Sequence, residues 1–126
     1  MSTVSVRYIV DDIDAAIAFY TRRFGFEVEF HPGPGFAALS RGPLRLLLNT
    51  PGGGGGAGQT DPDGRVPHPG GWNRVQFQVD DLDAEVARLR EAGARFRNEV
   101  VEGRGGAQIL VEDPAGNPVE LFEPRR

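Results

Sequence analysis

The chain has 126 residues, of which 39% are hydrophobic, and a formal net charge of −4 at pH 7. This length fits one compact domain or two small halves that share a core, and the apolar residues are too scattered for a membrane-spanning helix. A nucleic-acid-binding surface is not expected, because it requires a basic footprint. Cysteine and lysine are both absent, which excludes disulfides, thiolate metal ligands, cysteine nucleophiles and Schiff-base catalysis.

Other catalytic residue types are sparse. The two histidines, His31 and His68, both lie next to prolines in loop-like stretches, so a Ser-His-Asp triad has little to draw on.

Residues 1–5 contain neither the basic start nor the apolar core of a signal peptide. We therefore expect a cytoplasmic protein that has neither nucleic acid nor a membrane as a partner.

The first half of the chain predicts a strand, a helix and three further strands, in that order. Residues 4–10 alternate between two faces, which is typical of a half-buried strand. Asp11 or Asp12 is in position to cap a helix whose apolar side chains recur every three or four residues, and Gly25 is placed to end it. Three strands are then expected, at residues 26–30, 36–40 and 44–49.

The second half repeats this order. Residues 74–79 alternate, Asp80 and Asp81 precede a second amphipathic helix, and Gly93 ends the helical pattern. The turn-forming residues 113–118 separate the last two of three further strands, which are expected at residues 95–101, 108–112 and 119–122. The chain therefore predicts an α+β fold made of two βαβββ modules.

A repeated motif supports two equivalent modules. The sequence Val10-Asp-Asp-Ile-Asp-Ala15 returns as Val79-Asp-Asp-Leu-Asp-Ala84, 69 residues later, and such a recurrence suggests two copies of one supersecondary unit. We predict a single domain at residues 1–126, with module 1 at 3–50 and module 2 at 72–124. The intervening segment at 51–71 includes five consecutive glycines and is either a disordered linker or a lid over the site.

Three stretches of the chain carry a family pattern. They are Val10-Asp-Asp-Ile-Asp-Ala-Ala-Ile-Ala-Phe-Tyr20 with Phe24-Gly25-Phe26 after it, Val79 to Ala84, and Glu112-Asp-Pro-Ala-Gly-Asn-Pro-Val-Glu-Leu-Phe122. In this order they resemble the vicinal oxygen chelate superfamily, which includes glyoxalase I, extradiol dioxygenases and bleomycin-resistance proteins. The resemblance implies paired βαβββ modules that form a cup-shaped mixed sheet. It implies no reaction, because the family holds both enzymes and pure binding proteins.

The resemblance also implies where a metal site would lie. The family's metal enzymes place His, Glu or Gln ligands on the first and last strands of each module, around a divalent ion with open coordination positions. The first-strand positions fall on Ser5 and Arg74, and the last-strand positions fall on Glu120 and on Leu46 or Arg45. Only Glu120 can ligate a metal, and Arg74 would place a permanent positive charge where the ion should sit. We therefore expect no metal and no other cofactor.

The cup face implied by the resemblance holds the candidate site. Arg74 and Glu120 can form an ion pair in place of the metal, and this pair either braces the structure or orients a polar or anionic group of a ligand. The predicted face combines polar and aromatic side chains, as small-molecule sites do. The expected ligand-binding residues are Ser5, Arg7, Phe36, Leu46, Trp72, Arg74, Gln76, Glu120 and Phe122.

Two functions of different classes follow from this face. The first is metal-independent binding of a small aromatic or polar compound, with sequestration of an antibiotic or other toxic metabolite, as in bleomycin-resistance proteins. The second is an enzyme, such as a glyoxalase-like lyase or isomerase, in which Glu120 is the general base and Arg74 stabilises an oxyanion. An arginine beside a carboxylate weakens it as a base, so we favour binding. A role that the residues do not reveal is the third alternative.

The resemblance finally implies a homodimer. Bleomycin-resistance relatives often pair across chains, and the sheet edges of the cup need partners. The modules can pair within one chain or between two chains, and the long glycine-rich segment permits either arrangement. A homodimer that binds a small molecule is therefore the expected assembly.

Overall fold

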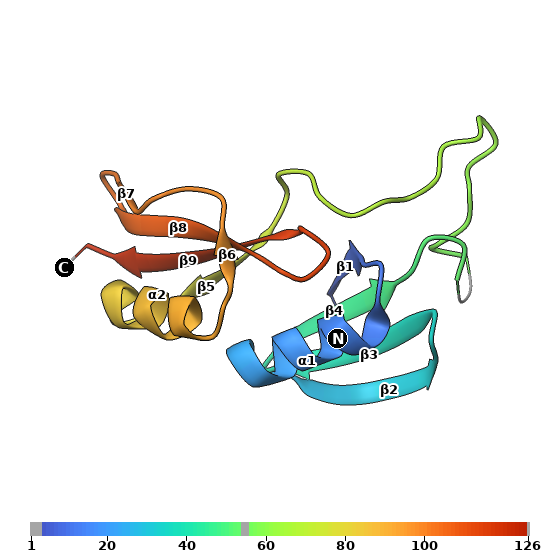
Figure 1. Ribbon diagram of the computed structural model, residues 1–126, viewed down its shortest axis with the longest axis horizontal. Helices are drawn as coiled ribbons and strands as arrows, with labels where there is room; N and C mark the ends of the chain where they lie inside the picture. Colours follow the sequence, from blue (N-terminus) through green and yellow to red (C-terminus); the bar gives the residue numbers. More distant parts are fainter. Residues whose placement is uncertain (1–3, 54–55, 126) are drawn as a thin grey trace. The chain divides into compact units, whose positions relative to one another are not determined.

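The computed structural model describes residues 4–53 and 56–125 and divides into two compact units, Met1–Gly70 and Gly71–Arg126. Each unit contains one helix and one sheet (Figure 1). The predicted α+β class with two related modules is therefore confirmed. Neither helix in the described part of the chain has the length and apolar character needed to span a membrane.

Unit 1 has a four-stranded sheet in the order β1-β4-β3-β2, in which β1 runs parallel to β4 and the other pairs are antiparallel. The helix begins after Asp12, whose side chain accepts a hydrogen bond from the backbone N–H of Ala15 at 3.1 Å. It ends at Gly25, whose φ of 70° favours glycine. The elements are β1 (Ser5–Ile9), α1 (Ile13–Phe24), β2 (Glu27–Gly33), β3 (Phe36–Arg41) and β4 (Leu44–Asn49).

The core of unit 1 lies between α1 and one face of this sheet. Tyr20 of α1 is fully buried and packs edge-on against Tyr8 of β1, with ring centroids 6.3 Å apart. Side chains alternate along a strand, so the residues next to Tyr8 point to the opposite face. That face, which we call the helix-free face of unit 1, carries Ser5, Arg7, Ile9, Phe36, Ala38, Ser40, Arg45, Leu47 and Asn49.

Unit 2 has the strand order β5-β9-β8-β6, with β7 paired to β8 and with β5 parallel to β9. Its helix begins after Asp81, whose side chain accepts from the backbone N–H of Ala84 at 3.1 Å. Gly93, with a φ of 83°, follows the last turn. The elements are β5 (Val75–Gln78), α2 (Leu82–Glu91), β6 (Arg95–Phe96), β7 (Val101–Glu102), β8 (Gly106–Glu112) and β9 (Pro118–Pro124).

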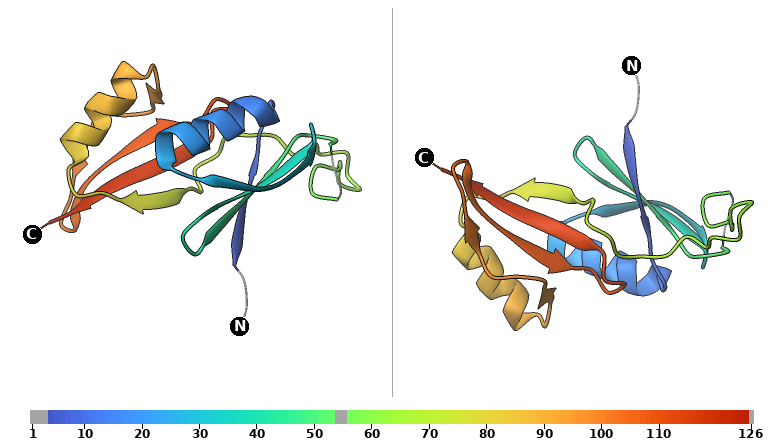
Figure 2. Two further views of the ribbon diagram at one scale, coloured as in Figure 1. Left: turned by 90° about the horizontal axis from the view of Figure 1, so that it is seen from below. Right: turned by 90° about the horizontal axis from the view of Figure 1, so that it is seen from above.

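The core of unit 2 is built in the same way, with α2 along one face of its sheet (Figure 2). Leu89 of α2 and Ile109 and Leu121 of the sheet are almost completely buried. The alternate residues form the helix-free face of unit 2, which carries Gln76, Gln78, Gln108, Leu110, Glu112, Glu120 and Phe122. In each unit one sheet face is therefore occupied by the core, and the other face holds the polar side chains.

One predicted strand is divided. Residues 95–101 were expected to form a continuous strand, whereas the structure has the two short strands β6 and β7. Between them the side-chain Oδ1 of Asn98 accepts a hydrogen bond from the backbone N–H of Leu110 at 2.9 Å, while the backbone N–H of Arg97 donates to the carbonyl of Leu110. A side-chain amide thus replaces a backbone acceptor and interrupts the regular ladder.

A second difference concerns the end of β2. The stretch that begins at His31 was read as loop-like, but residues His31 to Gly33 continue β2. The pairing of β2 with β3 shifts register on both sides of Phe30, as at β-bulges. An extra residue on one strand lets the chain bend without leaving the sheet.

The glycine-rich segment folds back on the end of β4 where the structure describes it. The backbone N–H of Gly52 donates to the carbonyl of Gly58 at 2.6 Å, and a Cβ at Gly58 would lie against the carbonyl oxygen of Thr50. Further along, Arg65 forms ion pairs with Asp61 and Asp63. Residues 54 and 55 lie outside the described residues, and the disordered linker and the lid both remain predictions.

Candidate functional site

Three polar side chains meet on the helix-free face of unit 2. The Nε of Arg74 donates to Oε1 of Glu120 at 2.9 Å, and Nη2 of Arg74 lies 2.8 Å from the same oxygen. The Nε2 of Gln76 donates to Oε2 of Glu120 at 2.6 Å. Both oxygens of the carboxylate are therefore engaged, and we call these three residues the Glu120 array.

The pairing of strands explains this meeting. β5 and β9 run in parallel, with Gln76 directly opposite Glu120, so their side chains leave the sheet on the same face. The turn before β9 is held by the buried Asp113, whose carboxylate accepts from the backbone N–H groups of Ala115 and Asn117 and from the side-chain amide of Asn117. This turn sets where β9 begins and hence the register of Glu120.

In the Glu120 array, two partners offset the cost of burying a carboxylate. Glu120 is 6% exposed, and the Arg74 side chain is 27% exposed. A buried carboxylate costs several kcal/mol unless a cation and hydrogen-bond donors compensate it, and here both are present. Within the described residues, no buried side-chain nitrogen or oxygen lacks a hydrogen-bond partner. Three of the four lone-pair positions of the Glu120 carboxylate are therefore occupied, and one position on Oε2 is left for a further donor.

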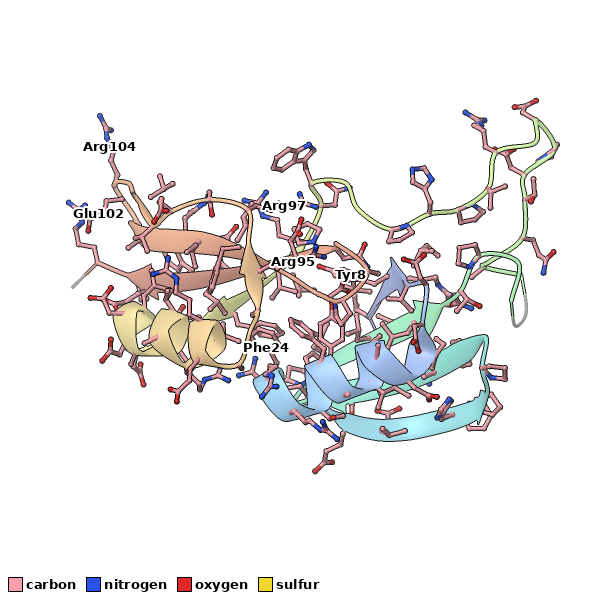
Figure 3. All side chains as sticks on the ribbon, in the orientation of Figure 1. Tyr8, Phe24, Arg95, Arg97, Glu102 and Arg104 are labelled. Atoms are coloured by element: carbon pink, nitrogen blue, oxygen red, sulfur yellow. The ribbon has the colours of Figure 1, made fainter. Side chains whose placement is uncertain are left out.

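A second cluster surrounds Arg97, which follows β6 (Figure 3). Its Nε donates to Glu112 at 2.9 Å, and its two terminal nitrogens donate to the carbonyls of Gly71 at 2.6 Å and Gly116 at 2.8 Å. The guanidinium carbon also lies 4.8 Å from the centre of the Trp72 ring, within the range of a cation–π contact. Arg97 thus joins the start of unit 2 to its last turn.

These contacts hold Trp72 at a defined place. The Nη1 of Arg74 donates to the carbonyl of Trp72 at 3.1 Å, while Arg97 contacts the ring. Trp72 is nevertheless 69% exposed. An aromatic surface that is both accessible and held from two sides can stack on a flat molecule with little loss of side-chain freedom.

Sequence reasoning missed Arg97. The residue lies in a stretch that was read only as a strand, and its partners Gly71 and Gly116 are far away in the sequence. Backbone carbonyls carry no residue-specific signal, so no motif could have indicated them.

Of the predicted site residues in unit 2, the structure brings Arg74, Gln76 and Glu120 into direct contact, and the remaining two behave differently. Trp72 contacts Arg74 through its backbone, and Phe122 lies on the same sheet face opposite Gln108.

On the helix-free face of unit 1 the structure places Ser5, Arg7 and Phe36. The Nη1 of Arg7 donates to Oδ1 of Asn49 at 2.6 Å. The ring of Phe36 packs edge-on against Phe30, with centroids 6.3 Å apart. These side chains belong to unit 1 alone.

Leu46 lies on the other face of that sheet. It is completely buried and pairs with Val6 and Leu39 on the side that α1 covers. Leu47, opposite Arg7, is the counterpart of Glu120, opposite Gln76. The register therefore makes Leu47 the counterpart of Glu120 in place of the expected Leu46 or Arg45, and Leu46 is excluded from this face because a shift of one residue moves a side chain to the opposite face of a strand.

Phe36 also lines an open hollow at the end of unit 1. The hollow has a volume of about 450 Å³ and offers backbone atoms, small residues and one aromatic ring. Its lining residues are Pro32, Gly33, Pro34, Gly35, Phe36, Thr50 and Gly53.

The donor set at the four family positions does not fit a divalent metal ion. Ser5, Leu47 and Arg74 occupy three of these positions, and the fourth, Glu120, is bonded to a guanidinium. Metals of this kind need several nitrogen or oxygen ligands around one point. In residues 4–53 and 56–125, no group of three or more histidine, cysteine, aspartate or glutamate side chains could hold one.

Comparisons with known proteins agree with this fold. A curated relative, the cadmium-induced protein CadI of Mycobacterium tuberculosis, is 37% identical over 105 residues, and the same figures hold for CadI of Mycobacterium bovis. The match covers 79% of this chain, and the chain spans only 59% of the length of those relatives.

Among solved structures, lactoylglutathione lyase from Agrobacterium tumefaciens is similar with a TM-score of 0.75 and 27% identity, covering 97% of this chain and 92% of that chain. TnmS3, an antibiotic binding protein from Streptomyces sp. CB03234, has a TM-score of 0.72 and 24% identity, covering 99% and 97%. The family model Glyoxalase/Bleomycin resistance protein/Dioxygenase superfamily matches residues 3–121. The chain therefore belongs to this superfamily, as its helix-start motifs and its last strands predicted.

Proposed function

We propose that this protein binds a small, flat organic compound without a metal ion, and that it sequesters an antibiotic or another toxic metabolite in this way. The observation that carries the proposal is Trp72, which is 69% exposed and yet held by Arg97 and Arg74. Exposed aromatic surface beside a few fixed polar groups is the usual composition of a small-molecule site.

In this proposal the Glu120 array supports the site. Arg74 and Gln76 compensate the buried carboxylate, and Arg74 also fixes the backbone of Trp72. The likeness to TnmS3, at 24% identity, extends to the fold alone, so the choice of ligand class rests on Trp72 and its surroundings. Phe122 and Gln108 lie on the same helix-free face but at the other end of the strand pair, opposite Gln78.

The alternative is a lyase or isomerase in which Glu120 is the general base. The likeness to lactoylglutathione lyase favours this alternative. Against it stand the two hydrogen-bonded oxygens of Glu120 and the residues at the metal positions. A base must be able to reach the proton that it removes, and Glu120 is only 6% exposed and is bonded at both oxygens.

A ligand screen tests the proposal directly. Trp72 is the single tryptophan, so a bound aromatic compound should change the intrinsic fluorescence of the protein. We expect Trp72→Ala to weaken binding of any hit about tenfold by calorimetry, which corresponds to about 1.4 kcal/mol, and Trp72→Phe to retain most of the affinity. Val66→Ala, at another exposed apolar side chain, is the control. A hit that binds Trp72→Ala as well as it binds wild type would contradict the site.

Metal analysis tests the second part of the proposal. Protein purified without chelators should contain well under one equivalent of nickel, zinc, iron or manganese, because Arg74 and Leu47 cannot ligate these ions. Inductively coupled plasma mass spectrometry after dialysis measures this content. One retained equivalent per chain would show that the metal positions have been misassigned.

The role of Arg74 can be separated from ligand binding by a double-mutant cycle. We expect Arg74→Ala to lower the free energy of unfolding by about 3 kcal/mol, because it leaves the buried Glu120 carboxylate without its cation. The double variant Arg74→Ala with Glu120→Gln should recover most of this loss, since the stranded charge is gone. Urea denaturation measures both values.

The matched control for this cycle is Arg45→Ala. Arg45 pairs with Glu29, but both side chains are 40% exposed, so its loss should cost less than about 1 kcal/mol. If Arg74→Ala proves as mild as Arg45→Ala, the Glu120 array does not brace unit 2, and Arg74 is then free to serve as a ligand contact.

We also propose a homodimer. The edge strand β2 is exposed along most of its length and presents Val28 at 47% and Phe30 at 56% exposure. Exposed apolar edge strands invite pairing with another chain. Light scattering at micromolar concentration should therefore give twice the mass of the chain, and a monomeric mass would refute the dimer.

A further inference from the structure

Arg7 of unit 1 and Arg74 of unit 2 stand at different positions of the repeat, and their guanidinium groups have different partners. In unit 2 the guanidinium of Arg74 contacts the carboxylate of Glu120, so its charge is compensated. In unit 1 the guanidinium of Arg7 donates to the neutral amide of Asn49 at 2.6 Å. No carboxylate in the described part of the chain forms an ion pair with Arg7. Unit 1 therefore carries a net positive charge at a defined point of its helix-free face.

Asn49 orients this charge. Its side chain is almost completely buried, and it lies in β4 between Ile9 of β1 and Phe36 of β3. An arginine side chain can only donate hydrogen bonds, so the amide oxygen of Asn49 must face Arg7. The guanidinium is thereby held through one nitrogen. Its remaining N–H groups lie in one plane, and a carboxylate or phenolate is the acceptor that matches them.

The surroundings of Arg7 also suit an organic anion. Arg45, the next arginine on the same face, is paired with Glu29 at 3.1 Å and so does not share the role. Phe36, directly opposite Asn49, lines the hollow of about 450 Å³. An aromatic or aliphatic body could rest against Phe36 while its acidic group reaches Arg7.

We propose that unit 1 contains an anion site in which Arg7, positioned by Asn49, binds the acidic group of a small aromatic carboxylate or phenolate. Because Arg7 forms no ion pair with a carboxylate of the described residues, an anion that binds to it has no such carboxylate to displace. At Arg74 the same anion would have to compete with Glu120. The proposal concerns unit 1 alone and does not depend on the aromatic site at Trp72.

The test uses benzoate and its neutral analogue benzamide as probes. In ¹⁵N-labelled protein, the side-chain Nε–Hε signal of Arg7 is identified by its absence from the Arg7→Gln variant. We expect benzoate to move this signal saturably and benzamide to bind at least about tenfold more weakly, since it lacks the charge. The Arg45 signal, which reports an arginine already paired, is the internal control and should remain in place.

Asn49→Asp provides a variant of nearly identical shape. It puts a carboxylate beside Arg7, as Glu120 stands beside Arg74, and should lower the benzoate affinity about tenfold while the melting temperature is retained or raised. If Asn49→Asp does not fold, Arg7→Gln, at an exposed side chain, still decides the question by the loss of benzoate binding in calorimetry. The proposal is overturned if benzoate moves neither signal, moves Arg45 as much as Arg7, or binds Arg7→Gln as it binds wild type.

The outcome is independent of the fluorescence screen. Benzoate binding at Arg7 without any aromatic hit at Trp72 would uphold the anion site and refute the Trp72 site on which the proposed function rests. Aromatic hits that depend on Trp72, with no response of Arg7, would do the reverse.

Discussion

The parallel pairing of the first and last strands of each unit is the constraint on which the polar chemistry depends. β1 lies beside β4 and β5 lies beside β9, and in both cases the helix occupies one face of the pair. Polar side chains of these strands must then gather on the other face. This arrangement places Arg7 within reach of Asn49 and Gln76 directly opposite Glu120.

The same arrangement of strands and helix therefore carries different side chains in the two units. In unit 2 a buried carboxylate requires a cation and an amide around it, and the result is a closed, compensated cluster. In unit 1 the residue at the position of Glu120 is Leu47, and the buried amide of Asn49, two residues further along β4, accepts from Arg7 and leaves its charge without a carboxylate. The two units thus share their order of strands and helix, while the charged groups on their helix-free faces differ.

This divergence bears on the function within the superfamily. Enzymes that use a metal at these positions need converging ligands, whereas this chain places a serine, a leucine and an arginine at three of the four positions. Rigid placement of Trp72 by Arg97 and Arg74 uses backbone carbonyls and a cation–π contact, neither of which requires a metal. Binding by shape, aromatic surface and fixed charge is the chemistry that we propose for these residues.

Interactions between residues that are close in the sequence explain the features that the sequence by itself determined. The caps at Asp12 and Asp81, the helices after them and the alternating strands follow from hydrogen bonds and periodicities within a few residues, and the repeat and the family follow from the same motifs. Tertiary structure alone decided that Leu47 rather than Leu46 faces away from α1, and that Arg97 holds Trp72. Strand parity depends on the partner strand, and a hydrogen bond to a distant carbonyl depends on the path of the whole chain, so neither could be inferred from neighbouring residues.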